Sequence, residues 1–284
     1  MLLGSITVLA AVFAALTCVL GSFSGAAVVF GTLGCFIGYW LGLLLIAFAV
    51  LWISCAAVDT SKPQEHDSKY FRRLVKLYIP AVFSLLRMDI QAEGMEKLPG
   101  DGRFLLVCNH LNILDPVLLL GCFPQCQLAF ISKQENADMF LIGKIMHRLM
   151  CQMINRENDR EALKTIIRCI QMIRDDEVSV AVFPEGYTSR DVKLHHFRSG
   201  VFKIATKTQV PIVLCTLQNT QDIFHNIKRL KKTDVPLHVV DVLHPETFPG
   251  RTAVDISQEA YEKMLGDLGP AFALPEENGG EIDN

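Results

Sequence analysis

The most constraining feature of the sequence is its uncharged beginning. Residues 1–58 contain no Asp, Glu, Lys or Arg, so all 27 basic and all 30 acidic residues follow Val58. Leu2–Leu20 and Leu33–Ala57 each approach the roughly 20 apolar residues that cross a bilayer core. This pattern predicts a hydrophobic helical hairpin over residues 1–58, which either crosses the bilayer or dips into one leaflet. A secretory signal peptide would need a basic start, which is missing here.

A basic segment, residues 59–88, follows the hairpin. Lys69 to Met88 mixes cations with large apolar side chains, which predicts an amphipathic helix, and Pro80 predicts a break or kink in it. This helix either lies at the membrane surface as an interfacial linker or faces the core of the next domain. Five cations follow the second apolar stretch and predict that its C-terminal end lies on the cytoplasmic side. They are Lys62, Lys69, Arg72, Arg73 and Lys76. We therefore expect a membrane protein whose main domain lies on the cytoplasmic face.

Residues 89–274 alternate between short apolar runs and helical patterns, and Asp159 to Arg174 is the clearest helix. This alternation predicts an α/β domain with a mixed, largely parallel sheet flanked by helices. The expected strands are Phe104–Cys108, Gln127–Ile131, Ser179–Phe183, Pro211–Thr216 and Leu237–Val242. Residues 275–284 form a polar, acidic tail that we expect to be disordered.

Charge and cysteine usage exclude some functions. A net charge of −3 without an arginine-rich groove does not favour a nucleic-acid binder. The nine cysteines are an odd number dispersed through apolar runs, which indicates buried thiols in a reducing compartment. Cys122 and Cys126 lack a second ligand pair at metal spacing, so we predict no metal site.

A histidine and an aspartate follow the first expected strand. His110 comes directly after the apolar run, and Asp115-Pro116 reads as a helix start with Asp as the cap. On a continuous helix the two side chains would lie roughly 140° apart, so the pair fits a turn between a strand and a helix. A carboxylate that fixes the tautomer of an imidazole makes it a good general base. A chance pair is the alternative explanation, because such spacings also arise at random.

Three further motifs follow in order. Ile154-Asn-Arg156 ends a short run, and its arginine suits phosphate recognition, although it could instead pair with a neighbouring carboxylate. Phe183-Pro-Glu-Gly186 closes a strand with a tight turn, where Glu185 is either a ligand or simply solvated. Val210-Pro-Ile212 opens another strand and could serve packing alone.

The order and spacing of these four motifs resemble the glycerolipid acyltransferase family, over roughly Gly94 to Thr216. Within that family the pattern looks most like the members that acylate 1-acyl-sn-glycerol 3-phosphate. Asn112 and Asn155 depart from the family pattern. Tyr187-Thr188 also departs from the commoner Thr-Arg, so one cation expected near the acceptor is missing. Arg190 and Arg198 are the candidates to replace this cation.

The resemblance implies a role for each motif. His110 would be the general base and Asp115 would orient it. Substrate contacts would come from Lys133, Arg156, Glu185, Gly186 and Arg190, with the phosphate held by Arg156 and Lys133 and the glycerol part by Glu185 and Gly186. Val210, Pro211 and Ile212 would shape the acyl or acceptor pocket.

The implied reaction transfers an acyl chain from acyl-CoA or acyl-carrier protein to lysophosphatidic acid at a lipid bilayer, and gives phosphatidic acid for phospholipid biosynthesis. A thioester is already activated, so the chemistry needs a base and positioning but no bound cofactor, metal or covalent intermediate. Another acceptor, such as glycerol 3-phosphate or a different lysophospholipid, is the alternative. A serine hydrolase is disfavoured because no G-x-S-x-G motif occurs. A non-catalytic lipid-binding protein is disfavoured because all four polar side chains are intact.

Overall fold

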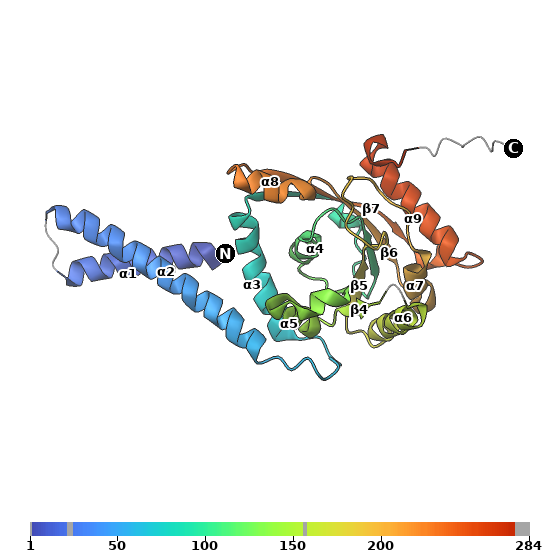
Figure 1. Cartoon of the computed structure of the whole chain (residues 1–284), viewed down its shortest axis with the longest axis horizontal. Helices are drawn as coiled ribbons and strands as arrows, with labels where there is room; N and C mark the ends of the chain where they lie inside the picture. The colour runs from blue at the N-terminus through green and yellow to red at the C-terminus, as the bar shows by residue number, and fades with distance from the viewer. Residues whose placement is uncertain (1, 22–24, 156–157, 276–284) are drawn as a thin grey trace.

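The computed structural model describes residues 2–21, 25–155 and 158–275. Its first two helices, α1 (Leu2–Leu20) and α2 (Ala26–Ala56), lie side by side and extend away from the rest of the protein (Figure 1). Both helices are long and apolar enough, by length and composition, to cross a membrane. The predicted hairpin is therefore present as two packed helices.

The end of α2 is attached to the rest of the protein. Tyr78 on α3 (Lys69–Leu85) donates a hydrogen bond from its hydroxyl to Ala47 O at 2.6 Å. The Trp52 ring packs 4.4 Å from the ring of Phe140 on α5 (Phe140–Arg148). At 1.5 Å per residue α2 is about 46 Å long, beyond the roughly 30 Å of a bilayer core. The part of α2 that exceeds this thickness includes the end that packs against α3 and α5.

The main domain is built on a mixed sheet with the order β1-β7-β6-β2-β5-β3-β4 in the part of the chain that the structure describes. β2 to β6 are mutually parallel, β7 runs antiparallel to β6, and β1 is parallel to β7. The strands are β1 (Met88–Glu93), β2 (Leu105–Cys108), β3 (Leu128–Lys133), β4 (Gln152–Ile154), β5 (Ser179–Val182), β6 (Ile212–Leu217) and β7 (Thr233–Leu243). The predicted mixed, largely parallel sheet is confirmed.

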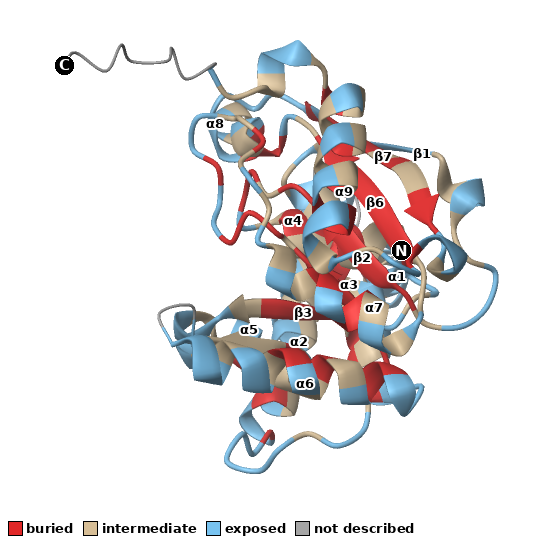
Figure 2. Ribbon diagram, turned by 90° about the vertical axis from the view of Figure 1, so that its right-hand side faces the viewer, coloured by how far each residue is buried: buried red, intermediate tan, exposed pale blue. Residues whose placement is uncertain are grey.

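Both faces of the sheet are covered by helices, so its central strands are buried (Figure 2). Successive side chains of β2 point to opposite faces, and Leu105 and Leu106 accordingly belong to different core clusters. One face packs against α6 (Asp159–Arg174), α7 (Lys203–Thr208) and α9 (Ala253–Leu268). The other face packs against α3, α4 (Asp115–Cys122), α5 and α8 (Ile223–Lys228).

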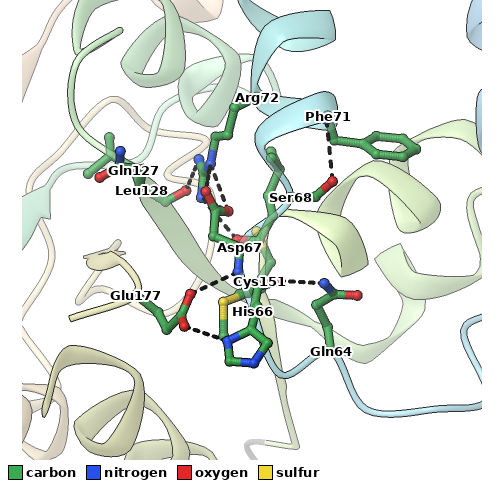
Figure 3. A network of polar contacts seen from close by, with 12 residues as sticks. Gln64, His66, Asp67, Ser68, Phe71, Arg72, Gln127, Leu128, Cys151 and Glu177 are labelled. Carbon is green, nitrogen blue, oxygen red and sulfur yellow. Dashed lines mark hydrogen bonds and ion pairs between the residues drawn. The ribbon is translucent and has the colours of Figure 1, made fainter. Parts of the chain in front are cut away.

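A polar network attaches the start of α3 to the domain (Figure 3). The Arg72 guanidinium donates to both carboxylate oxygens of Asp67 at 2.9 and 3.0 Å, and also to Leu128 O at 2.7 Å and Leu149 O at 3.2 Å. Glu177 accepts from Asp67 N at 3.0 Å, and one of its oxygens lies 2.6 Å from His66 Nδ1. The linker before α3 is therefore bonded to the α/β domain at several points.

One face of α3 packs against the α/β domain, as one of the two predicted alternatives requires: Phe71 and Leu74 are buried in the core, whereas Arg73 and Lys76 are exposed. A place at the membrane surface stays a prediction. The helix continues through Pro80, so of the predicted break or kink the break does not occur. Pro80 is exposed, and the carbonyl that its missing N–H leaves unpaired can be hydrated by water.

Candidate functional site

The site lies where two neighbouring parallel strands end. β2 leads to β3 and β5 leads to β6, so these two connections run in opposite directions across the sheet. Ligands of open α/β sheets bind at the carboxyl ends of strands where the direction of the connections switches. His110 follows β2 and Glu185 follows β5, so both motifs meet at this crevice.

His110 and Asp115 form the predicted pair. His110 Nδ1 lies 2.9 Å from Asp115 Oδ2, and the same oxygen accepts hydrogen bonds from Leu111 N at 2.7 Å and Asn112 N at 2.8 Å. Because a carboxylate only accepts, Nδ1 carries the hydrogen and Nε2 is left for a substrate. The His110 ring stacks on Phe183 with centroids 4.2 Å apart, which fixes its plane.

Asp115 does not cap the helix that it begins, which corrects the sequence interpretation. α4 starts at Asp115 with Leu114 as its N-cap residue, and no side-chain capping bond is present there. The fully buried carboxylate turns back to the loop before the helix instead. Pro116 still occupies the first turn, where its missing N–H costs nothing.

Two asparagines that the sequence did not mark as functional hold the His110 loop. The Asn109 amide donates to Leu217 O at 2.9 Å and accepts from Leu217 N at 2.8 Å, so it extends the pairing of β2 with β6. Asn112 donates to Thr220 O at 2.8 Å. A polar residue directly after a buried strand was the only sequence signal for Asn109.

Glu185 lies behind the pair. Its side chain is buried, and its two oxygens accept hydrogen bonds from His110 N at 2.9 Å and His195 N at 3.0 Å. Burial raises the pKa of Glu185 to about 7, although both N–H groups favour the carboxylate. Gly186 has φ +86°, and a Cβ there would lie 2.8 Å from Arg198 Nε. Neither Glu185 nor Gly186 is among the residues that line the cavity beside His110, so their contact with the glycerol part of the acceptor stays a prediction.

His110 faces a cavity of about 910 Å³, at the upper end of the range for small-molecule sites. The cavity's walls are mostly apolar and come from α3, α4 and α5, for example Leu74, Val117 and Ile145. Leu51 of α2 also reaches it. Its polar lining residues include Lys133 at the end of β3 and several residues of the segment after β5, whose Ser189 N donates to His110 O, namely Tyr187, Thr188, Arg190, Asp191 and His195. The cavity can hold an apolar chain with a polar group at one end.

The structure brings some of the other predicted site residues to this cavity. Lys133 and Arg190 both line it, and the Lys133 side chain is 59% exposed, with Nζ 3.7 Å from a Glu135 oxygen. Arg198 is not among the lining residues and instead lies against Gly186. Arg156 lies outside the described residues.

Val210, Pro211 and Ile212 are not brought to this cavity. Ile212 pairs with Leu105 at the start of β2, whereas His110 follows the other end of that strand. All three residues therefore lie at the opposite edge of the sheet, where Ile212 is fully buried and Val210 packs against the core. The structure supports the packing interpretation of this motif.

Similarity to known proteins agrees with this architecture. The family profile described as Acyltransferase matches residues 89–218. The chain is 30% identical over 197 residues to a probable 1-acyl-sn-glycerol-3-phosphate acyltransferase of Mycoplasma pneumoniae, covering 68% of this chain and 71% of that protein. It is 33% identical over 157 residues to the chloroplastic 1-acyl-sn-glycerol-3-phosphate acyltransferase BAT2 of Brassica napus, covering 55% of this chain but only 44% of the plant protein.

The fold is also found among solved structures. The crystal structure of the 1-acyl-sn-glycerophosphate acyltransferase PlsC from Thermotoga maritima superposes with a TM-score of 0.59 and 22% identity, covering 81% of this chain and 92% of that chain. At this identity the likeness shows the fold alone.

An enzyme that acylates glycerolipids has to hold a base beside an apolar pocket, and the β2–β5 crevice does so. The protein is thus an acyltransferase of the glycerolipid class. The chain is 30% identical to the Mycoplasma protein and covers 71% of its length. It therefore belongs to the family of 1-acyl-sn-glycerol-3-phosphate acyltransferases.

Proposed function

We propose that this protein is a membrane-anchored enzyme that transfers an acyl chain from acyl-CoA or acyl-carrier protein to the sn-2 hydroxyl of 1-acyl-glycerol 3-phosphate, which gives phosphatidic acid. The observation that carries the proposal is the His110–Asp115 pair at the polar end of the apolar cavity. Relatives from a bacterium and a plant carry the name of this reaction.

His110 acts as the general base in this mechanism. Nε2 takes the proton from the acceptor hydroxyl while the hydroxyl oxygen attacks the thioester carbonyl carbon. The tetrahedral intermediate then collapses, the carbon–sulfur bond breaks, and the imidazolium returns its proton to the thiolate. Asp115 stabilises the imidazolium through Nδ1, and its contacts to two backbone N–H groups keep it in place.

The acceptor phosphate binds at the cationic rim of the cavity. Lys133 and Arg190 line that rim, and Arg156 joins them on the sequence pattern alone. Glu185 is a positioning residue in this assignment, because its oxygens hold the backbone of His110 and His195 rather than a substrate. No bound cofactor is needed, since the donor brings the activated acyl group.

The apolar part of the cavity receives the acyl chains. An acyl chain that leaves the bilayer needs an apolar site, because each methylene that is exposed to water costs about 0.8 kcal/mol. Leu51 of the hairpin helix α2 and five residues of α3 line the cavity, so the hairpin itself reaches the cavity wall. This contact supports entry of the substrates from the membrane, and the cations that follow the hairpin support a domain on its cytoplasmic face.

The test is acyl transfer by the purified full chain in lipid nanodiscs, with labelled acyl-CoA and acyl-carrier protein as alternative donors. The acceptors are 1-acyl-glycerol 3-phosphate, glycerol 3-phosphate and lysophosphatidylcholine. Phosphatidic acid formed by the wild type and not by His110→Ala would support both the reaction and the base. Transfer only to another acceptor would keep the mechanism and replace the substrate. Lipid binding without transfer to any acceptor would overturn the proposal.

A further inference from the structure

The cavity contains a second histidine–aspartate pair that the mechanism above does not use. His195 Nε2 lies 2.9 Å from Asp191 Oδ1, and both residues line the same cavity as His110. The backbone of His195 is held by Glu185, the same carboxylate that holds the backbone of His110. One buried side chain therefore sets the position of both imidazoles.

The contacts of this second pair determine which nitrogen meets a ligand. Asp191 Oδ1 also lies 2.8 Å from Ser189 Oγ and accepts from Lys193 N at 3.3 Å. The hydrogen bond from His195 and these contacts lower the pKa of Asp191 to about 2, so it remains a carboxylate. Because this carboxylate binds Nε2, the group that His195 can offer to the cavity is Nδ1.

The charge of the surrounding rim indicates the kind of ligand. Lys133 and Arg190 line the cavity together with His195. Thr188 also lines it, but it carries no charge at the position where the family pattern has a cation. Asp191 is the acidic residue among the cavity's described lining residues, and its Oδ1 contacts His195, Ser189 and Lys193. The lining therefore offers an anion two cationic side chains and one imidazole.

We propose that His195 is a specificity-determining residue that binds the phosphate of the acceptor through Nδ1, together with Lys133 and Arg190. This inference rests on the proposed function and assigns a phosphate monoester to the rim of the cavity. His195 donates to the phosphate when its ring is protonated, and Asp191 balances the resulting charge.

The test compares KM for 1-acyl-glycerol 3-phosphate with KM for 1-monoacylglycerol, which lacks the phosphate. In His195→Gln we expect KM for the phosphate-bearing acceptor to rise about 10-fold, the scale of a hydrogen bond to a charged group. KM for 1-monoacylglycerol should not change. In His195→Lys, which supplies a cation at the same place, the low KM for the phosphate-bearing acceptor should persist.

The neighbouring histidine is the matched control. His196 stacks on Tyr261 and does not line the cavity, so His196→Gln should leave both KM values unchanged. If His195→Gln raises KM equally for both acceptors, or for neither, the His195–Asp191 pair only fixes its loop. Either result would overturn this inference and leave the proposed function standing. A wild-type chain that transfers nothing to 1-acyl-glycerol 3-phosphate would overturn the proposed function as well.

Discussion

At the scale of single residues, the site shows a histidine that is fixed at its backbone and its ring. His110 N donates to Glu185, His110 O accepts from Ser189 N at 2.8 Å, and Nδ1 binds Asp115. Two of these contacts come from the segment after β5 and the third comes from the start of α4, so the base is preorganised before a substrate arrives. The sequence predicts His110 and Asp115 because their spacing and residue types carry the chemistry. It does not predict the positioning role of Glu185, because burial of a glutamate depends on contacts with distant segments.

The first prediction concerns the base itself. His110→Ala should lower kcat by about 10²-fold or more, the scale of a lost general base. The thermal unfolding midpoint should change little, because the His110 ring lines a cavity. Asp115 loses its contact with the ring but still accepts hydrogen bonds from two backbone N–H groups. Single-turnover acyl transfer measures the chemical step. Turnover within threefold of the wild type would remove His110 from the mechanism.

The second prediction concerns the pH dependence of stability that arises from Glu185. Burial raises the pKa of this carboxyl to about 7 in the folded protein, above its ordinary value of 4.5. The neutral form is therefore favoured by folding, and the resulting stability is complete below about pH 4.5 and lost as the pH rises through about 7. The change amounts to about 3 kcal/mol at most.

Glu185→Gln removes this titration and keeps the shape of the side chain. The unfolding midpoint of the wild type should therefore fall relative to that of the variant as the pH rises from 5 to 8, measured by denaturation in one detergent. Parallel midpoint curves across this range would contradict the raised pKa.

At the scale of elements, local patterns predict the elements that bury one clear face. The helix over Asp159–Arg174 is confirmed at both ends, and each of the five expected strands is present within a few residues. β1 was not predicted, and its six residues have no buried side chain. The reversed direction of β7 was not predicted either, because strand direction depends on pairing between distant segments. The motif at Val210 was correctly predicted to open a strand, and its place away from the His110 cavity depends on the same pairing between distant segments.

The third prediction concerns α3, whose attachment shapes the cavity. Arg72 and Asp67 have side chains only 15% and 10% exposed, so their ion pair is largely removed from water. Arg72→Ala leaves the Asp67 carboxylate and two carbonyls without this donor, and should reduce the free energy of unfolding by about 3 kcal/mol.

Arg73→Ala is the control for this variant, because Arg73 is the exposed neighbour on the same helix. It should change stability by less than about 0.5 kcal/mol. Since α3 lines the cavity, Arg72→Ala should also raise KM for long-chain acceptors more than for short-chain ones. Equal stability of the two variants would contradict the role assigned to the network in Figure 3.

At the scale of the whole molecule, the uncharged beginning and the charged remainder correspond to two different surfaces. The hairpin exposes large apolar side chains along α1 and α2, such as Phe30, which is 74% exposed, and Leu45, which is 69% exposed. All the charged residues lie after the hairpin, in the linker, the α/β domain and the tail. Exposed apolar surface on this scale is stable in lipid and unfavourable in water, so the hairpin rather than the domain is the part that we expect to enter the bilayer.

The last prediction tests this assignment with substitutions that differ only in their location. Phe30→Asp, Leu41→Asp and Leu45→Asp together place three carboxylates on the exposed side of α2, where each costs about 3 kcal/mol at the centre of a membrane helix. This variant should move from the membrane fraction to the soluble or aggregated fraction. Leu163→Asp, Ile167→Asp and Val254→Asp alter three side chains of the α/β domain that are 52%, 56% and 62% exposed, and this variant should stay with the membrane. If both variants remain in the membrane fraction after an alkaline wash, the hairpin is not the anchor; if both leave it, the loss reflects misfolding or added charge rather than the place of the substitutions.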